Sequence, residues 1–358
     1  MGSPRNETAP GSSTPWKGRG WPGEQCAGPA ASIAADLSPI KTTIRYDLRV
    51  QFTAAPTETP AMTVLGPILV ATDFSAHARH AADRAARLAH EAHSALTLLH
   101  VLPGEPLAQI REWLGASSAP EQKMREEAHQ QLLDMAAALA SARHVQVNTE
   151  DATGSPLDEI LRAADRLDAR LLVLGARGVG FLRRLVLGTT SERLMRRTDR
   201  PLLVVRQTPH EPYRRVLVAV DFSPWSRESV TLARRVAPNA HLVLLTVFQV
   251  PFEEKLHFAG VDAATVETYR QQARAQARQR VFALADEAGL TPAQWEPCVV
   301  EGDASLRIVE NEQSHDCDLV VLGKHGQSAT ADLLLGSVTK HVLAEGSADV
   351  LVSTRLSA

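Results

Sequence analysis

Short apolar runs alternate with longer amphipathic segments from about residue 65 to the end of the chain. The first five runs read PILVAT, ALTLLHV, HVQVNTE, RLLVLG and PLLVVR. The next five read RVLVAV, HLVLLTV, the weaker stretch 294–300, DLVVLG and DVLVST. Buried strands separated by helices are typical of βαβ units, and therefore of a mostly parallel sheet with helices on both faces. The pattern predicts two doubly wound α/β domains of five strands each.

Two of the amphipathic segments carry clear helix ends. Ser75 can cap a helix that runs to about Ala92, and the segment 265–288 predicts a second helix ended by Gly289. The second helix carries four arginines, Arg270, Arg274, Arg278 and Arg280. We interpret them as a solvated face rather than a nucleic-acid stripe, because acidic residues flank them and the sequence shows no accompanying aromatic platform.

The chain contains an internal repeat. VATDFS at 70–75 returns as VAVDFS at 218–223, which pairs Asp73 with Asp221 at an offset of 148 residues (221 minus 73). The same offset relates three glycine pairs, Gly154 and Gly302, Gly175 and Gly323, and Gly188 and Gly336. A fixed offset kept over this length indicates a tandem duplication.

The repeat divides the chain into three parts. Residues 1–62 are dense in Gly, Pro, Ser and Thr and predict a disordered tail. The two domains are expected at 63–209 and 210–358. Met62 lies just before the first strand and is an alternative start of the protein, so translation of residues 1–61 stays open.

A glycine-rich loop follows the fourth strand of each copy. The loops read GARGVGFLRRLVLGTTS (175–191) and GKHGQSATADLLLGSVT (323–339). Both have a Gly, two residues, a Gly, nine residues, a Gly and then Ser or Thr. The first two glycines allow a sharp turn and expose backbone N–H groups. The last glycine precedes a helix, predicted to start at Thr189 or Ser337, whose free N–H groups favour phosphate.

An aspartate follows the first strand of each copy, Asp73 in one and Asp221 in the other. Open α/β sheets bind ligands at the carboxyl ends of their strands, where a carboxylate suits ribose hydroxyls or an adenine amino group. A single glycine after a strand is more often part of a turn than of a ligand loop. The complete spacing occurs twice at the same distance from an equivalent aspartate, which favours a ligand site, although duplication copies structure and function alike.

Both loops resemble the nucleotide motif of the ATP-binding branch of the universal stress protein family, as do the surrounding LVLGARG, LLGSVT and PLLVVR. The resemblance covers about residues 65–356. It implies an adenine nucleotide alpha hydrolase-like sheet of order 3-2-1-4-5 in each half, with the ligand crevice between strands one and four. It also implies that the two fifth strands pair about a pseudo-twofold axis, which makes an intrachain pseudo-dimer. Further homodimerisation stays open.

The resemblance also implies the nucleotide contacts by position. Base and ribose would lie on Ala71, Asp73 and Val101 in the first copy, and on Ala219, Asp221 and Val247 in the second. The polyphosphate would lie on Gly175, Arg177, Gly178, Gly188, Thr189 and Thr190, and on Gly323, His325, Gly326, Gly336, Ser337 and Val338. Thr190 and Ser191 stand where the family usually has Val and Thr. The implied ligand is ATP, ADP or AMP, with or without Mg²⁺.

The two loops differ in charge. The first carries Arg183 and Arg184 between its last two glycines, whereas the second carries Asp332 and no basic residue there. Lys324 and His325 are candidates to compensate. We expect the first site to bind a triphosphate more tightly, because nearby cations favour a polyanion.

Composition indicates which partners and which cellular compartment to expect. A formal net charge of -3 and a pI near 6.5 argue against nucleic-acid and anionic-membrane partners. Cys26, Cys298 and Cys317 form no paired framework, which suits free thiols in a reducing cytoplasm. No apolar stretch reaches the roughly 18 residues that span a bilayer. We therefore expect a cytoplasmic protein.

Nucleotide-gated stress response or signalling, with an unidentified protein partner, is the function these features favour. A non-nucleotide interaction scaffold is the first alternative. An adenylating enzyme is less favoured, because the sequence lacks an SGGxDS-type loop, a HIGH-like pair and a P-loop. We expect no catalytic residues, although slow ATP hydrolysis stays open. The pairs His77 and His80, and His90 and His93, could share a helix face, but nothing completes a metal site and none is expected.

Overall fold

The computed structural model describes residues 65–105, 119–176, 189–250, 258–324, 326 and 335–354. The tail, Met62, Cys26 and several loop residues lie outside the described residues, namely Arg177, Gly178, Arg183, Arg184, Gly188, His325 and Asp332. For Thr189 only the backbone is described.

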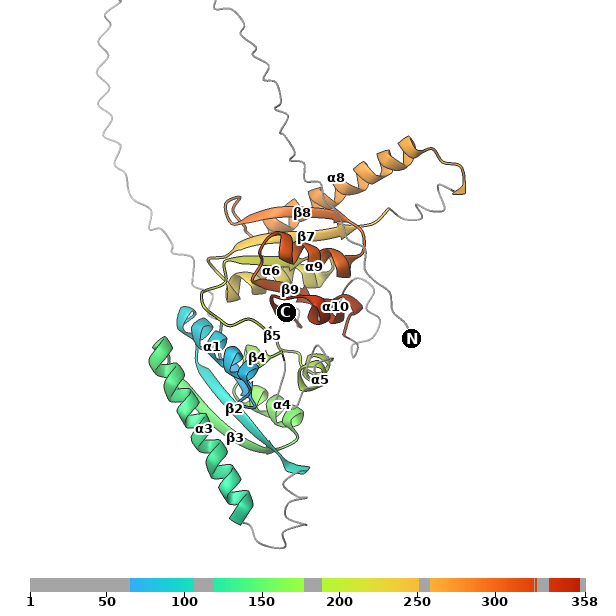
Figure 1. Cartoon of the computed structure of the whole chain (residues 1–358). Coiled ribbons are helices and arrows are strands. Elements are labelled where there is room, and N and C mark those ends of the chain that lie inside the picture. The colour runs from blue at the N-terminus through green and yellow to red at the C-terminus, as the bar shows by residue number, and fades with distance from the viewer. Residues whose placement is uncertain are drawn as a thin grey trace, which may run out of the picture. The chain divides into compact units, whose positions relative to one another are not determined.

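The apolar runs form one ten-stranded sheet (Figure 1). Its strands are β1 (Ile68–Thr72), β2 (Leu96–Pro103), β3 (Val147–Gly154), β4 (Leu171–Gly175), β5 (Leu202–Val205), β6 (Arg215–Ala219), β7 (His241–Phe248), β8 (Trp295–Glu301), β9 (Leu319–Gly323) and β10 (Asp349–Ser353). The strand order is β3-β2-β1-β4-β5-β10-β9-β6-β7-β8. Each half therefore has the predicted order 3-2-1-4-5. The predicted pairing of the fifth strands is also confirmed, because β5 and β10 pair antiparallel, with Leu203 opposite Leu351.

Helices cover both faces of the sheet, as predicted. They are α1 (Ala76–Glu91), α3 (Ala119–Arg143), α4 (Pro156–Arg166), α5 (Thr189–Arg197), α6 (Pro224–Val236), α8 (Ala263–Glu287), α9 (Ala304–Ser314) and α10 (Ser337–Glu345). Buried residues of α1, α3, α6 and α8 form one apolar cluster with one face of the sheet. Buried residues of α4, α5, α9 and α10 form a second cluster with the other face. This sandwich is the doubly wound α/β architecture.

The helix ends follow the capping chemistry, with one correction. Ser75 caps α1 as predicted, and its Oγ accepts a hydrogen bond from Ala78 N at 3.2 Å. The helix expected from Thr265 begins two residues earlier, at Ala263. Asp262 is its N-cap and accepts from Thr265 N at 2.9 Å. Asp is a stronger N-cap than Thr, so the structure favours the earlier start.

The third strand was expected at 144–150, and this placement is wrong by several residues. β3 begins at Val147 and continues to Gly154, paired along its length with β2. His144 instead has a left-handed φ of 52° in the turn after α3. β3 is an edge strand with mixed burial. The apolar pattern that locates buried strands is therefore weak in it.

Three arginines of α8, Arg274, Arg278 and Arg280, are exposed and lie near aromatic rings, whereas Arg270 is half-buried. Arg280 lies over the Phe222 ring at 4.0 Å, Arg278 over Phe282 at 5.3 Å and Arg274 over Phe248 at 5.8 Å. Arg270 pairs with Glu267 and Glu301. Phe222 and Phe248 come from other segments of the chain, so only the tertiary structure brings them under the helix. Three of the arginines therefore lie against aromatic rings, two of which belong to other segments of the chain.

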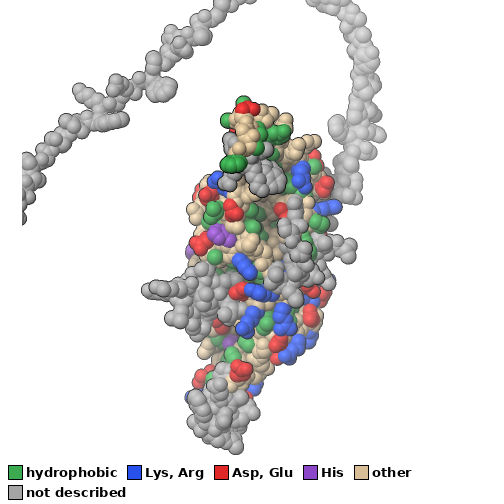
Figure 2. All heavy atoms as spheres, turned by 90° about the vertical axis from the view of Figure 1, so that its right-hand side faces the viewer, with side chains coloured by type: hydrophobic (Ala, Val, Ile, Leu, Met, Phe, Trp, Pro, Cys, Tyr) green, Lys and Arg blue, Asp and Glu red, His purple; other side chains and the backbone are tan. Residues whose placement is uncertain are grey.

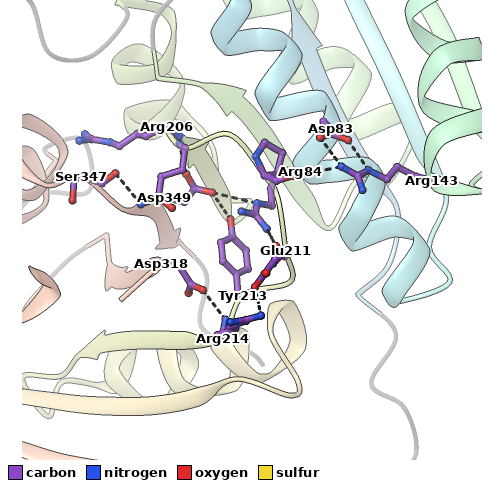
Figure 3. A network of polar contacts seen from close by, with 12 residues as sticks. Asp83, Arg84, Arg143, Arg206, Glu211, Tyr213, Arg214, Asp318, Ser347 and Asp349 are labelled. Atoms are coloured by element: carbon purple, nitrogen blue, oxygen red, sulfur yellow. Dashed lines mark hydrogen bonds and ion pairs between the residues drawn. The ribbon is translucent and has the colours of Figure 1, made fainter. Parts of the chain in front are cut away.

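A buried polar network joins the two halves beside the β5–β10 pair (Figure 3). Asp349 is fully buried and lies 3.4 Å from Arg84, which comes from α1 of the first half. Tyr213 donates its hydroxyl to the same carboxylate at 2.7 Å, and the Arg84 guanidinium lies 4.0 Å from the Tyr213 ring centre. Arg206 N and Gln207 N also donate to Asp349, at 2.7 and 3.0 Å. The Asp349 carboxylate thus binds groups from both halves where the two halves meet.

Tyr213 makes stability sensitive to alkaline pH. Burial, followed by the nearby Asp349 carboxylate, raises the pKa of Tyr213 well above its ordinary value of 10.0. Its contribution is therefore complete below about pH 10 and is lost as the pH rises further, because the unfolded chain then releases a proton that the folded chain keeps. We expect Tyr213→Phe to lower the free energy of unfolding by about 1.5 to 3 kcal/mol near neutral pH, because it removes a hydrogen bond to a carboxylate, and to flatten the alkaline loss of stability.

Urea unfolding on both sides of pH 10 would measure this effect. Tyr269→Phe is the matched control, because Tyr269 is 53% exposed on α8 and should change neither quantity. An alkaline loss of stability that is the same in Tyr213→Phe and in the wild type would contradict the assignment.

Candidate functional site

At the carboxyl edge of the sheet the first and fourth strands of each half separate, and we call this place the crevice of that half. The β1–β4 ladder ends at the pair Val70 and Val173, although both strands continue beyond it. The β6–β9 ladder ends in the same way at Val218 and Val321. Here the strand order reverses direction, because β2 and β7 lie on the other side of β1 and β6. These are the switch points where open α/β sheets bind ligands.

Ala71 and Val101 lie beside the first crevice, and Ala219 and Val247 lie beside the second. Ala71 pairs with Leu99 on β1 and β2, just before Val101. Both alanines and Val247 are half-buried against the core, and Val101 is buried. The predicted base-binding residues are therefore apolar positions at the ends of the first two strands in each half.

The aspartates occupy equivalent tight turns. Asp73 Oδ1 accepts from Ser75 N at 3.1 Å, and Asp221 Oδ1 accepts from Ser223 N at 2.9 Å. The residue after each aspartate has a left-handed backbone, with φ of 62° at Phe74 and 63° at Phe222. Phenylalanine rarely adopts this conformation, so its repetition indicates a turn that the surrounding structure imposes. Clusters of such strain are typical of functional sites.

The halves stabilise this turn with different residues that sequence reasoning did not single out. In the first half, His100 Nδ1 contacts Thr72 O at 2.8 Å and its ring stacks on Phe74 at 4.3 Å. In the second half, Ser226 Oγ accepts from Asp221 N at 3.1 Å and donates to Asp221 Oδ1 at 3.0 Å. Neither residue repeats between the copies, so no internal signal pointed to them.

Gly175 has a steric reason to be glycine, and Gly326 lies close to a carboxylate. A Cβ at Gly175 would lie 2.7 Å from the backbone carbon of His77, so the end of β4 passes directly against the start of α1. A Cβ at Gly326 would lie 2.9 Å from Asp221 Oδ2. The structure therefore brings the loop glycine of the second half against the carboxylate that follows β6, although the two are far apart in the sequence.

The helices after the loops begin where predicted, α5 at Thr189 and α10 at Ser337. Gly336 is the N-cap of α10, and no side chain caps this helix end. Thr190 and Val338 are half-buried in the first turns of the two helices, and Ser337 is exposed. Uncapped N–H groups at a helix start are suited to an anion.

Ser191 and Thr339, at equivalent positions, turn their hydroxyls toward the strand ends. Ser191 Oγ lies 3.5 Å from Gly175 O, and Thr339 Oγ1 lies 3.4 Å from Gly323 O. Both side chains are buried. These hydroxyls therefore tie each helix to the end of its strand, a role that sequence reasoning did not assign.

Lys324 forms hydrogen bonds with the first half of the chain. It is 4% exposed, and its Nζ donates to Arg196 O at 3.2 Å and Thr198 O at 3.1 Å, both at the end of α5 in the first half. The sequence suggested that this lysine compensates for the missing basic residues of the second loop. Its ammonium is instead directed to a helix C-terminus, where a cation is favourable.

Cysteine and metal chemistry find no support in the described part of the chain. Burial raises the pKa of Cys317 to about 12, and burial also raises the pKa of Cys298, so neither thiol is an activated nucleophile. His77 and His80 have ring centres 6.4 Å apart. Residues 65–105, 119–176, 189–250, 258–324, 326 and 335–354 contain no group of three or more potential metal ligands. Within the same ranges, no helix is long and apolar enough to cross a membrane.

Comparison with known proteins agrees with the fold. The model of the universal stress protein family matches twice, at residues 65–206 and 212–354. A universal stress protein of Mycobacterium tuberculosis is 27% identical over 220 residues, 60% of this chain and 72% of that protein. One from Mycolicibacterium smegmatis is 27% identical over 309 residues, covering 80% and 96%. A crystal structure from Archaeoglobus fulgidus superposes with a TM-score of 0.60 at 18% identity, covering 81% of this chain and 96% of that chain.

The two family matches fall on the two halves of the sheet, and the duplicated crevice recurs in each. The chain therefore belongs to the universal stress protein family and carries the family's domain twice.

Proposed function

We propose that each half binds one adenine nucleotide, ATP or its ADP or AMP relative, and that occupancy regulates an interaction with a protein partner. The main support is the arrangement that both halves share. In each half an aspartate follows the first strand, and the helix after the glycine-rich loop begins at the same edge of the sheet. The closeness of Gly326 to Asp221 carries the proposal furthest, because it brings the glycine-rich loop and the carboxylate together in space.

The chemistry of the crevice suits a nucleotide. The apolar ends of β1 and β2 offer a surface for a base, Asp73 or Asp221 offers acceptor oxygens for ribose hydroxyls, and the helix start offers N–H groups for phosphate. Asp73 Oδ1 and Asp221 Oδ1 each hold their own turn, so these carboxylates are rigidly placed. Rigid placement favours recognition of a ligand. Mg²⁺ would accompany the polyphosphate, and binding rather than rapid turnover is the proposed activity.

The cysteines and the surface charges bear on the cellular compartment and on the kind of partner. Unpaired Cys298 and Cys317 support a reducing cytoplasm. Lys and Arg side chains gather on the face shown in Figure 2, with Asp and Glu side chains among them. Acidic and basic side chains also pair with one another, as Arg197 of α5 does with Asp158 of α4. Mixed charges of this kind favour a protein partner over nucleic acid or an anionic membrane.

The test is calorimetric titration of the full chain with ATP after denaturation and refolding, which removes any ligand carried through purification. We expect two equivalents of ATP per chain. Failure of ATP, ADP and AMP to bind would reject the nucleotide site and favour the scaffold alternative.

The two sites should differ in their affinity for triphosphate. Asp73→Ala would leave the second site to be measured alone, and Asp221→Ala would leave the first. We expect the first site to bind ATP about tenfold more tightly, since one charge-assisted hydrogen bond accounts for such a factor. The engagement of Lys324 with α5 strengthens this expectation.

Repeating both titrations with AMP is the control. The difference should shrink, because AMP carries less charge, and it should also shrink in high salt. Equal ATP affinities in the two variants would contradict the charge argument.

A further inference from the structure

The two halves cap each other's helices with cations, a buried Lys324 and a half-buried Arg206. Lys324 follows β9 in the second half and donates its ammonium to Arg196 O and Thr198 O at the end of α5 in the first half. Arg206 follows β5 in the first half, and its guanidinium donates to Leu343 O and Gly346 O at the end of α10 in the second half. A cation at a helix C-terminus offsets the partial charge of the last carbonyls. Each anion-facing helix is thus held at its far end by the opposite half.

The two caps do not occupy equivalent positions. By the offset of 148 residues, Lys324 corresponds to Ala176, and Arg206 corresponds to Thr354. Lys324 directly follows Gly323, the last residue of the strand that forms one wall of the second crevice. Arg206 follows β5, which lies outside both crevices. Of these two residues, only Lys324 therefore links a strand beside one crevice with the helix that begins beside the other crevice.

The connection is short and rigid. Lys324 N donates to Ser353 O at 2.7 Å, which fixes its backbone in the sheet of the second half. Its side chain is 4% exposed, so the ammonium has little freedom to leave the α5 carbonyls. α5 has nine residues, about 13 Å of helix, and begins at Thr189 beside the first crevice. A displacement of Gly323 would therefore be transmitted to the N-terminus of α5 through the Lys324 side chain and the length of α5.

We propose that Lys324 is a positioning residue that couples the two crevices, so that a ligand in the second strengthens binding in the first. The coupling rests on the nucleotide binding proposed above. A ligand held against Gly323 and Gly326 fixes the backbone of Lys324, and the fixed ammonium holds α5 in the position that binds phosphate. Thermodynamic linkage makes the effect reciprocal. We expect a ligand in one crevice to raise the affinity of the other about fivefold, which is near the lower end of typical couplings between sites.

Calorimetry on the refolded full chain tests the coupling with ATP as the probe. The product of both association constants in the unaltered chain is compared with the product of the single-site constants from Asp221→Ala and Asp73→Ala. The ratio should be about five in the wild type. In a Lys324→Met background, with the same two substitutions, it should fall to one. Lys324→Arg should restore it, since a guanidinium can reach the same carbonyls.

Arg206→Met is the matched control, because it removes the cap of α10 without touching a crevice strand, and the ratio should stay near five. A wild-type ratio of one or less, with both single-site variants still binding ATP, would overturn the coupling and leave the proposed function standing. An unchanged ratio in Lys324→Met would also overturn it. Loss of all ATP binding in the wild type would reject the proposed function itself. If Lys324→Met fails to fold, Lys324→Gln takes its place, because its shorter, uncharged side chain also removes the cation from the α5 carbonyls, and a ratio that stays near five in it would overturn the coupling.

Discussion

Asp349→Ala should lower the free energy of unfolding by about 3 to 5 kcal/mol, the cost of removing one partner from a buried ion pair. Asp349 has no exposed side-chain surface and Arg84 has 4%. Removing the carboxylate leaves the Arg84 charge buried, and it also removes the acceptor for Tyr213 Oη and for the N–H groups of Arg206 and Gln207. These losses act together at the junction shown in Figure 3.

Urea denaturation of the full chain would measure this loss. Glu310→Ala is the control, because Glu310 pairs with Arg307 at 2.7 Å on the surface of α9 and is 56% exposed. Such exposed pairs contribute about 1 kcal/mol or less. Replacing both Arg84 and Asp349 with apolar residues of similar size should recover much of the loss, since no charge is then stranded. An Asp349→Ala cost no greater than that of Glu310→Ala would show that the network does not hold the halves together.

Gly326→Val should weaken ATP binding in the second crevice by about 100-fold or more. A Cβ at this position would lie 2.9 Å from Asp221 Oδ2, and valine adds two methyl groups beyond it. The carboxylate must move, so the proposed ribose contact is lost, and the side chain fills the space next to the loop backbone. Loss of a hydrogen bond to a charged group costs about 1.5 to 3 kcal/mol, which alone is roughly a factor of 10 to 100.

The first crevice is the internal control for this variant. Titration with ATP should show one remaining equivalent, weakened at most by the modest coupling proposed above. Gly326 is exposed, so the thermal midpoint of unfolding should change little. Gly326→Ala should give a smaller loss, because it adds the Cβ alone. Two full-strength equivalents in Gly326→Val would place the ligand away from Gly326 and Asp221.

The sequence alone determined the architecture and the location of the crevices. Strongly buried strands such as β1 and β9 are read directly from continuous apolar runs, because a strand covered on both faces has few polar positions. The helix start at Ser75 follows from local capping chemistry. The glycine spacing and the repeated aspartates are likewise local, and duplication made them visible twice. Recognition of the family then supplied the strand order, which apolar periodicity does not contain.

Only the tertiary structure decided what lies between the copies and beneath the exposed helices. The edge strand β3 was misplaced because its mixed burial gives a weak pattern. The contacts of Asp349 with Arg84, and of Lys324 with α5, join residues more than 120 positions apart, and neither repeats between the copies. A contact of this kind leaves no periodic or local trace, since it depends on how one half packs on the other. Local patterns therefore define each domain, whereas the packing of one half on the other determines how the two are joined.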